Sequence, residues 1–215
     1  FGTIRPEKPN QFKDTTKMLP YLKKLGVTTI YMLPFADSPM EDAGFDVKNP
    51  QNVRTDLGGK LQFERFIKEA KSQGFNIKAD LVLNHCSDQH EWFQQALKGD
   101  LDKLDYFIVR NDMPEYTKYT DPKLGTVVEY KEDDGKISKR RLIFPEITEH
   151  NWRKVTIEGK DYYVYHTFYP FQLDINWKKP EVLYYNLETI NYWANLGVDI
   201  FRLDAIPYLD KEPGT

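Results

Sequence analysis

Apolar residues occur along this chain in two kinds of run. Segments with a period near 3.6 residues, as expected for helices buried on one side, end at Gly26, Gly74 and Gly197. Each glycine is followed by a short apolar run that predicts a buried strand: residues 27–33, 77–83 and 198–203. A helix, a glycine and an apolar strand, found three times, indicate α/β units and therefore a parallel sheet.

The three helices are predicted to pack on this sheet through one face each. The second spans residues 61–72, and the third begins at Pro180, a residue type favoured in a first helical turn. The side chains expected to be buried are Met18, Leu22 and Leu25 in the first helix, Phe63, Phe66, Ile67 and Ala70 in the second, and Leu183, Leu187, Ile190 and Trp193 in the third.

A long segment between the second and third strands has a different pattern. It begins with a predicted helix at residues 89–97 and contains hairpin signals at Asp134-Gly135 and Glu158-Gly159. The hydrophilic residues 123–139 resemble an extra hairpin. Antiparallel strands are predicted at residues 126–130, 141–144 and 162–166. We therefore expect three parts: an α/β part at residues 1–87, an inserted α+β domain at 88–177, and a second α/β part at 178–215.

Polar residues follow each of the three predicted strands: Asp37 and Ser38, Asn84 and His85, and Asp204. In closed β/α barrels the active site lies at this C-terminal end of the strands. A closed barrel has eight strands and about 250 residues, and only three such strands are predicted here. We expect an α/β fold, a partial (β/α)8 TIM barrel comprising about strands 2 to 4, with the insertion as its domain B.

Composition excludes several classes of function. Hydrophobic residues make up 40% of the 215 residues and charged residues 29%, with a net charge of −3. The basic stripe that nucleic-acid binding requires is missing from the sequence. The apolar runs are shorter than the ~20 residues of a membrane helix, and no secretory signal pattern is visible. We expect a cytoplasmic protein with no nucleic-acid or membrane partner.

The numbers and positions of cysteine and histidine also limit which metal sites and nucleophiles the chain can form. The single cysteine, Cys86, excludes an internal disulfide and a cysteine-rich metal site. Cys86 lies beside His85, as a thiol nucleophile would, but a small residue that closes a strand is the favoured interpretation. The four histidines lack the spacing of a metal-ligand cluster, which disfavours a metal-dependent hydrolase.

Asp204 is the leading candidate for a catalytic residue. Arg202 stands two positions earlier on the same predicted strand, so both side chains point to the same side. A guanidinium beside a carboxylate favours the ionised form, which suits a nucleophile or a charge stabiliser. The alternative is an ion pair at a strand end that only stabilises the fold.

A second group of polar residues lies on the strand predicted at 77–83. Asp80 and Asn84 share one face of this strand, and a buried aspartate is unfavourable unless it is hydrogen-bonded. Asn84 and His85 at the strand tip are suited to bind a cation and a hydroxyl group. The alternative is that they cap the following helix.

These residues also match a family pattern. Asp80-Leu-Val-Leu-Asn84-His85 resembles the D-x-V-x-N-H motif of the α-amylase superfamily of glycoside hydrolases, and Phe201-Arg202-Leu203-Asp204-Ala205 resembles its G-F-R-x-D-A motif. Gln172-Leu173-Asp174-Ile175-Asn176 is similar to Q-P-D-L-N, and Gly44-Phe45-Asp46-Val47 resembles G-Y-D-V. The four motifs stand in the family's order, and the resemblance covers essentially the whole chain.

A closer resemblance is to the trehalose synthases, which interconvert maltose and trehalose. Residues 204–209, Asp-Ala-Ile-Pro-Tyr-Leu, with Gly214-Thr215 beyond them, are similar to the D-A-V-P-Y-L…G-T of that group. The resemblance implies a retaining enzyme that acts on an α-linked glucose disaccharide or oligosaccharide and has no organic cofactor.

The resemblance also implies roles for individual residues. Asp204 is implied to be the nucleophile, with Arg202 beside it. The residues implied to hold the glucose unit, together with Arg202, are Asp46, His85 and Gln172. The residues implied to surround a calcium ion are Asn84, Asp174, Tyr208 and Leu209, the last two partly through backbone oxygens. The chain departs from the family's usual residues at Pro50, Leu173, Ile200 and Lys211. Lys211 stands where trehalose synthases tend to have a calcium-binding glutamate, for which Asp210 or Glu212 could substitute.

Retaining cleavage uses two carboxyl groups about 5 Å apart, one as nucleophile and one as acid/base. The family's acid/base glutamate follows the fifth strand and its second stabilising aspartate follows the seventh, and neither strand is predicted here. We therefore expect these 215 residues alone to be inactive, and their apolar edges to favour self-association as a homo-oligomer or aggregate.

Three alternatives to a trehalose synthase remain at this point. One is an α-amylase or α-glucosidase-type hydrolase, and another is a different transglycosylase. The third is a non-catalytic relative, such as the carrier subunits of amino-acid transporters. Those subunits have a membrane helix and usually lose the aspartate that corresponds to Asp204.

Overall fold

The computed structural model describes residues 11–211, which divide into two compact units. The first unit comprises the residues up to Leu83 together with Leu183–Asp204. The second comprises Asn84–Val182 and the residues from Ala205 on. The segment that follows Asp204 therefore belongs to the second unit, whereas the sequence grouped it with the last α/β part. No helix within residues 11–211 is long and apolar enough to span a bilayer.

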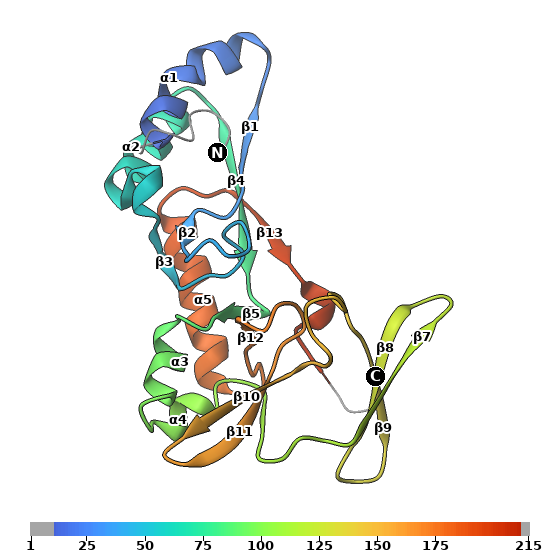
Figure 1. Cartoon of the computed structure of the whole chain (residues 1–215). Helices are drawn as coiled ribbons and strands as arrows, with labels where there is room; N and C mark the ends of the chain where they lie inside the picture. The colour runs from blue at the N-terminus through green and yellow to red at the C-terminus, as the bar shows by residue number, and fades with distance from the viewer. Residues whose placement is uncertain (1–10, 212–215) are drawn as a thin grey trace. The chain divides into compact units, whose positions relative to one another are not determined.

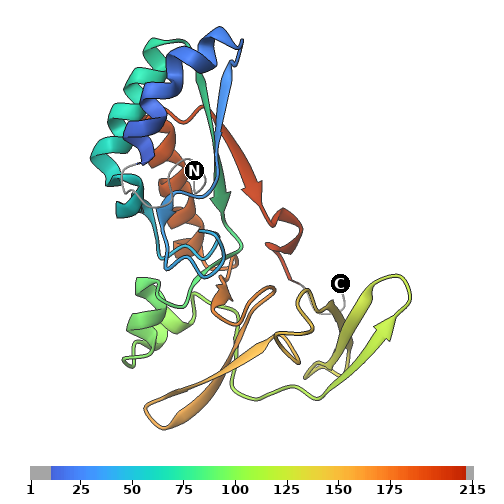
Figure 2. The same ribbon diagram turned by 45° about the horizontal axis from the view of Figure 1, so that its top comes forward.

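The first unit is built on a parallel sheet, as the sequence predicted. Its strands are β1 (Thr29–Met32), β4 (Asn76–Val82) and β13 (Ile200–Asp204), in the order β1-β4-β13. Its helices are α1 (Gln11–Lys24), α2 (Gly59–Ser72) and the part of α5 (Pro180–Asn195) from Leu183 on. Figures 1 and 2 show these helices on one side of the sheet. Within residues 11–211 the sheet is open, so a closed barrel is not formed.

Aromatic rings form the core between the helices and the sheet of this unit. Phe63 of α2 is the centre of this cluster, with Phe12, Phe35, Phe66 and Trp193 around it and the interacting ring centroids 4.8 to 6.3 Å apart. Each of these side chains is nearly or fully buried. The predicted inner face of α2 is confirmed, because all four of its predicted side chains are buried.

The predicted inner face of α1 is wrong. Met18 and Leu25 are exposed, and the buried stripe of α1 contains Phe12, Thr15 and Leu19. The helix carries two apolar stripes of helical spacing, and the one that includes the large Phe12 ring packs against the aromatic cluster.

The predicted face of α5 is right in part. Trp193 is buried as predicted, but Leu183 and Leu187 are exposed, and Asn186 and Thr189 are buried instead. Polar residues are tolerated on this inner face because they find hydrogen bonds: Thr189 donates to the Tyr185 carbonyl, and Trp193 Nε1 donates to the Pro50 carbonyl at 2.8 Å.

Glycine ends the helices of this unit as the sequence predicted. Gly197, after α5, has a φ of +106°, and a Cβ at this position would lie 2.7 Å from Ile67 Cγ2. Both its backbone conformation and its close approach to α2 therefore require glycine.

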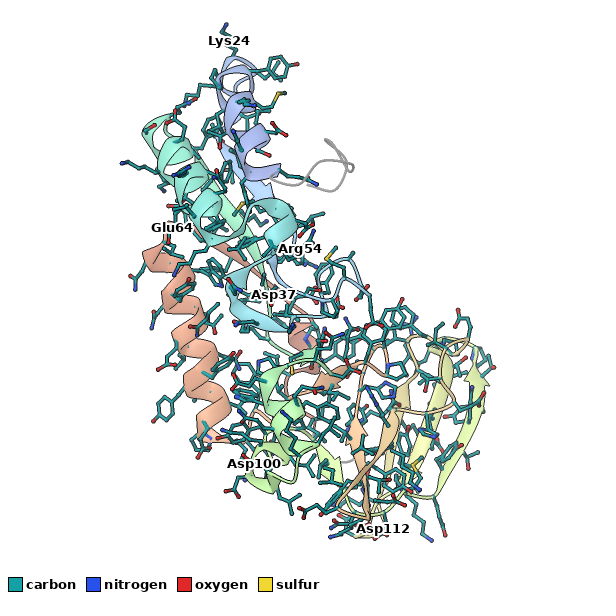
Figure 3. The ribbon with its side chains drawn as sticks, turned by 60° about the vertical axis from the view of Figure 1, so that its left-hand side comes forward. Lys24, Asp37, Arg54, Glu64, Asp100 and Asp112 are labelled. Atoms are coloured by element: carbon teal, nitrogen blue, oxygen red, sulfur yellow. The ribbon has the colours of Figure 1, made fainter. Side chains whose placement is uncertain are left out.

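A short hairpin follows β1. It pairs β2 (Ala36–Asp37) with β3 (Asn49–Val53) and leads into the 3-10 helix η1 (Thr55–Leu57). Arg54, labelled with Asp37 in Figure 3, donates its backbone N–H to the Phe35 carbonyl at 3.0 Å.

Up to Lys211, the second unit contains three small antiparallel sheets, two short α-helices and a 3-10 helix. The sheets are β10-β11-β6, β7-β8-β9 and β12-β5. The elements are β5 (His85–Ser87), α3 (Glu91–Ala96), α4 (Leu101–Leu104), β6 (Val109–Arg110), β7 (Tyr116–Asp121), β8 (Gly125–Lys131), β9 (Ile137–Arg141), β10 (Trp152–Ile157), β11 (Lys160–Tyr165), β12 (Gln172–Asp174) and η2 (Ile206–Tyr208).

Both predicted hairpin turns are confirmed. Asp134-Gly135 lies between β8 and β9, and Glu158-Gly159 lies between β10 and β11. The strand predicted at residues 141–144 lies earlier in the chain, as β9. Cys86 in β5 is buried, and burial raises the pKa of its thiol, which agrees with a structural rather than a nucleophilic cysteine.

Candidate active site

Asp204 is the last residue of β13, at the C-terminal edge of the parallel sheet. Arg202 Nη1 lies 3.1 Å from Asp204 Oδ1, so the period of two places both side chains on the same face, as predicted. The Asp204 side chain is 19% exposed and that of Arg202 is 45% exposed. A carboxylate that is partly accessible and paired with a guanidinium is suited to attack an electrophile.

Asp80 of the central strand β4 contacts the same guanidinium nitrogen of Arg202 as Asp204 does. Asp80 and Arg202 are partners in the β4–β13 register, and Arg202 Nη1 donates to Asp80 Oδ1 at 2.7 Å. The Asp80 side chain is fully buried. This hydrogen bond is the main cause that raises the pKa of Arg202, followed by the two carboxylate charges. The guanidinium is therefore permanently charged and shared between two carboxylates.

Tyr31 of β1 completes this arrangement. Its hydroxyl donates to Asp80 and lies 2.8 Å from Oδ1 and 2.9 Å from Oδ2. Partial burial, and then the hydrogen bond to Asp80, raise the pKa of Tyr31, so the hydroxyl keeps its proton. Tyr31, Asp80, Arg202 and Asp204 thus form one chain of polar contacts across the three strands.

Asp46 lies in the loop between β2 and β3 and organises it. Its carboxylate is fully buried and accepts hydrogen bonds from Ser38 Oγ at 2.8 Å, from the backbone N–H of Glu41 at 2.8 Å and from that of Asp42 at 3.2 Å. Gly44 in the same loop has a φ of +95°, and a Cβ there would lie 3.0 Å from the Pro34 carbonyl oxygen. The structure therefore gives Asp46 a definite structural role in its loop.

His85 and Gln172 belong to the second unit and lie on paired strands. β5 and β12 pair antiparallel, with His85 opposite Asp174 and Gln172 opposite Ser87. Both side chains are buried. The His85 ring packs edge-on against Phe168 at 5.2 Å, and Gln172 Oε1 accepts from the Tyr169 N–H at 3.3 Å.

Three of the four residues predicted to bind calcium meet in the second unit, around a lysine. Lys211 Nζ lies 2.7 Å from Asp174 Oδ2 and 2.9 Å from Asn84 Oδ1, and it also donates to the Tyr208 carbonyl. Among residues 11–211, no group of three or more His, Cys, Asp and Glu side chains is arranged to hold a metal ion. The oxygens present do not fit calcium in this arrangement, because an ammonium already contacts them.

The structure describes contacts among the predicted residues within each unit. In the first unit Arg202 and Asp204 meet, and Asp46 accepts its hydrogen bonds from its own loop. His85 and Gln172 lie on the β5–β12 pair, and Asn84, Asp174 and Tyr208 surround Lys211. Tyr31 was not predicted as a site residue, and its hydroxyl within a strand that was predicted to be buried is the sequence signal that marks it.

Comparison with known proteins places this chain in a family. Residues 11–215 match the family model of the alpha amylase catalytic domain. The chain therefore belongs to the alpha-amylase family, whose members act on α-glucosidic bonds.

Several curated relatives are trehalose synthases. The chain is 34% identical over 200 residues to a trehalose synthase/amylase of Mycolicibacterium smegmatis, covering 93% of this chain and 30% of the relative. It is 36% identical over 204 residues to the trehalose synthase of Thermus thermophilus, covering 95% and 19%. The trehalose-6-phosphate hydrolase of Escherichia coli is 33% identical over 231 residues, covering 99% and 36%. The chain thus spans about a third or less of the length of these relatives.

A solved structure agrees with this assignment. A trehalulose synthase mutant in complex with Tris superposes with a TM-score of 0.75 at 28% identity, covering 95% of this chain and 33% of that chain. The similarity covers both units, because nearly all of the chain is included.

Proposed function

We propose that the intact polypeptide carrying this chain cleaves and re-forms α-glucosidic bonds with retention of configuration, with Asp204 as nucleophile. The observation that supports this most is the Asp80–Arg202–Asp204 arrangement at the C-terminal edge of the sheet. In β/α enzymes this edge is where catalytic residues lie.

In this mechanism the Asp204 carboxylate attacks the anomeric carbon of an α-linked glucose unit. The bond to the leaving oxygen breaks as a second carboxyl group, about 5 Å from the first, gives that oxygen its proton. The product is a covalent glucosyl ester at Asp204. Water, or a sugar hydroxyl, then attacks the ester, loses its proton to the second carboxylate and frees Asp204.

Asp80 has a separate task in this scheme. When Asp204 becomes an ester it loses its negative charge, and Arg202 loses one partner. The buried Asp80 carboxylate still holds Arg202 at that stage. The guanidinium therefore remains paired and in position throughout the reaction, which keeps the site preorganised.

For the reaction itself, we propose conversion of maltose to trehalose by transfer of the glucosyl group. The similarity to trehalose synthases supports this, and Asp46, His85 and Gln172 are proposed to bind the glucose unit. The alternative is hydrolysis, favoured by the similarity to the trehalose-6-phosphate hydrolase of Escherichia coli. Both reactions share the glucosyl ester and differ in the group that attacks it.

Anomeric proton NMR of the intact polypeptide incubated with maltose separates these reactions. We expect a trehalose signal to appear, and to be lost in Asp204→Asn. Glucose as the sole product, also lost in the variant, would replace the transfer proposal by hydrolysis. Turnover of maltose that persists in Asp204→Asn would remove Asp204 from the nucleophile's role.

A further inference from the structure

The side chain of Lys211 ends among oxygen atoms of the second unit. Only 9% of this side chain is exposed, and the partner carboxylate of Asp174 is fully buried. The ammonium contacts Asp174 Oδ2, Asn84 Oδ1 and the Tyr208 carbonyl oxygen. It also lies 5.9 Å from the centre of the Tyr165 ring, whose negative face attracts a cation.

The hydrogen-bonding capacity of this group is fully used. An ammonium has three donors, and Lys211 has three oxygen acceptors. Asp174 also accepts from the Thr167 N–H at 2.9 Å, from Thr167 Oγ1 at 2.5 Å and from Asn84 Nδ2 at 3.2 Å. Every donor and acceptor in the group is therefore satisfied by the protein itself.

The charges balance as well. One buried carboxylate faces one ammonium, so the pair is neutral. A divalent ion on the same oxygens would face a nearby positive charge and only one carboxylate. It also needs about six to eight oxygen ligands, and three oxygens are gathered here.

We propose that the Lys211 ammonium takes the place that the family resemblance gives to calcium, so that the second unit is held together without a metal ion. The lysine acts as a cation that is covalently part of the chain. It joins the segment after η2 to the end of β12 and to Asn84 at any calcium concentration. This inference concerns the stability of the fold and does not depend on which sugar reaction the protein catalyses.

Thermal unfolding of the intact polypeptide tests the proposal, together with its metal content by mass spectrometry. A ligand that binds only the folded state raises Tm with its concentration. We expect the wild-type Tm to be the same in EDTA and in excess calcium chloride, and dialysed protein to contain no stoichiometric calcium. A Tm that falls in EDTA, or calcium that survives dialysis in a one-to-one ratio, overturns the proposal.

Two variants of Lys211 and one control extend the test. Lys211→Met leaves the Asp174 carboxylate buried and unpaired, and is expected to lower Tm by about 6 to 12 °C. Lys211→Glu replaces the ammonium by a carboxylate. It is expected to be less stable in EDTA and to regain at least half of the lost Tm in excess calcium. Lys160→Glu makes the same charge change at an exposed residue and is expected to show no calcium response.

Each variant result bears on the proposal. A wild-type Tm in Lys211→Met would show that the ammonium does not stabilise the fold. A Lys211→Glu variant that responds to calcium no more than Lys160→Glu would show that these oxygens do not form a cation site. Either result overturns the proposal, whereas a calcium response confined to Lys211→Glu supports it.

Discussion

Replacing Asp80 by asparagine separates the charge of this residue from its shape. The amide of the Asp80→Asn variant keeps the size of the side chain and an oxygen acceptor but has no negative charge. The buried Asp80 carboxylate accepts from Tyr31 and from Arg202 Nη1 at 2.7 Å. In Asp80→Asn, Arg202 keeps a single anionic partner, Asp204, to which it is 3.1 Å distant.

The expected loss of stability follows from these two donors. A hydrogen bond to a charged group contributes about 1.5 to 3 kcal/mol and a neutral one about 0.5 to 1.5, so each donor loses about 1 kcal/mol. The sum of about 2 kcal/mol is an upper value. Because Arg202 is 45% exposed, water screens part of its interaction, and we expect about 1 to 2 kcal/mol.

Asp80→Asn is also expected to lower activity, and more than its small loss of folding stability alone would suggest. Without the Asp80 carboxylate, Arg202 Nη1 keeps Asp204 as its one anionic partner, so the guanidinium and the nucleophile lose the contact that fixes their position. We expect kcat/KM to fall about 10- to 100-fold, mostly through kcat, because misplacement of a reacting group has effects of this size.

The assay is glucosyl transfer from maltose by the intact polypeptide, measured on folded protein only. Asp199→Asn is the control, because Asp199 directly precedes β13 at the end of the strand that is away from Asp204. There Asp199 pairs with Lys71 and accepts a hydrogen bond from the Ile77 N–H at 2.8 Å. This control is expected to lose stability and to keep kcat/KM. An Asp80→Asn variant whose kcat/KM stays within about twofold of wild type would refute the reasoning.

Three further predictions concern two single contacts and one buried histidine. Tyr31→Phe removes the second donor to Asp80 and should cost about 1 kcal/mol of stability in thermal unfolding, with a smaller loss of kcat than Asp80→Asn. An equal loss of kcat in the two variants would contradict the greater importance given to the contact between Asp80 and Arg202. Gly197→Ala should lower the free energy of unfolding by about 2 to 3 kcal/mol. Gly26→Ala should lower it by about 1 kcal/mol, because Gly26 has a φ of +81° but a Cβ there would have nothing within 4 Å. Equal losses would show that the contact with Ile67 is unimportant. Burial lowers the pKa of His166 from 6.5 to about 4, so as the pH falls the unfolded state binds the proton before the folded state does. The free energy of unfolding should therefore fall by up to about 3 kcal/mol between pH 6.5 and pH 4, and in His166→Gln this part of the pH dependence of urea unfolding should disappear.

Much of the first unit could be predicted from the sequence because its signals are local. The glycines that end the helices and the apolar strands after them lie within a few residues of each other, and the structure has all three strands. The inner face of α1, and that of α5 apart from Trp193, could not be predicted in the same way. Only the position of Phe63 and its neighbours selects the helix face that is buried.

The contacts of the candidate site also differ in whether local sequence predicts them. The contact between Arg202 and Asp204 follows from the period of a strand and was predicted. The contact of Tyr31 with Asp80 joins residues 49 positions apart on neighbouring strands, and that of Lys211 with Asn84 joins residues 127 positions apart. Such contacts depend on strand order and on the path of the chain, which no local pattern contains.

The most direct test of Asp204 as the nucleophile is to trap the glucosyl ester. A fluorinated α-glucosyl fluoride forms the ester faster than it is hydrolysed, so intact polypeptide treated with it can be digested and its labelled peptide sequenced by mass spectrometry. We expect one glucosyl label per molecule, on Asp204, and none in Asp204→Asn. A label on any other carboxylate would contradict the account.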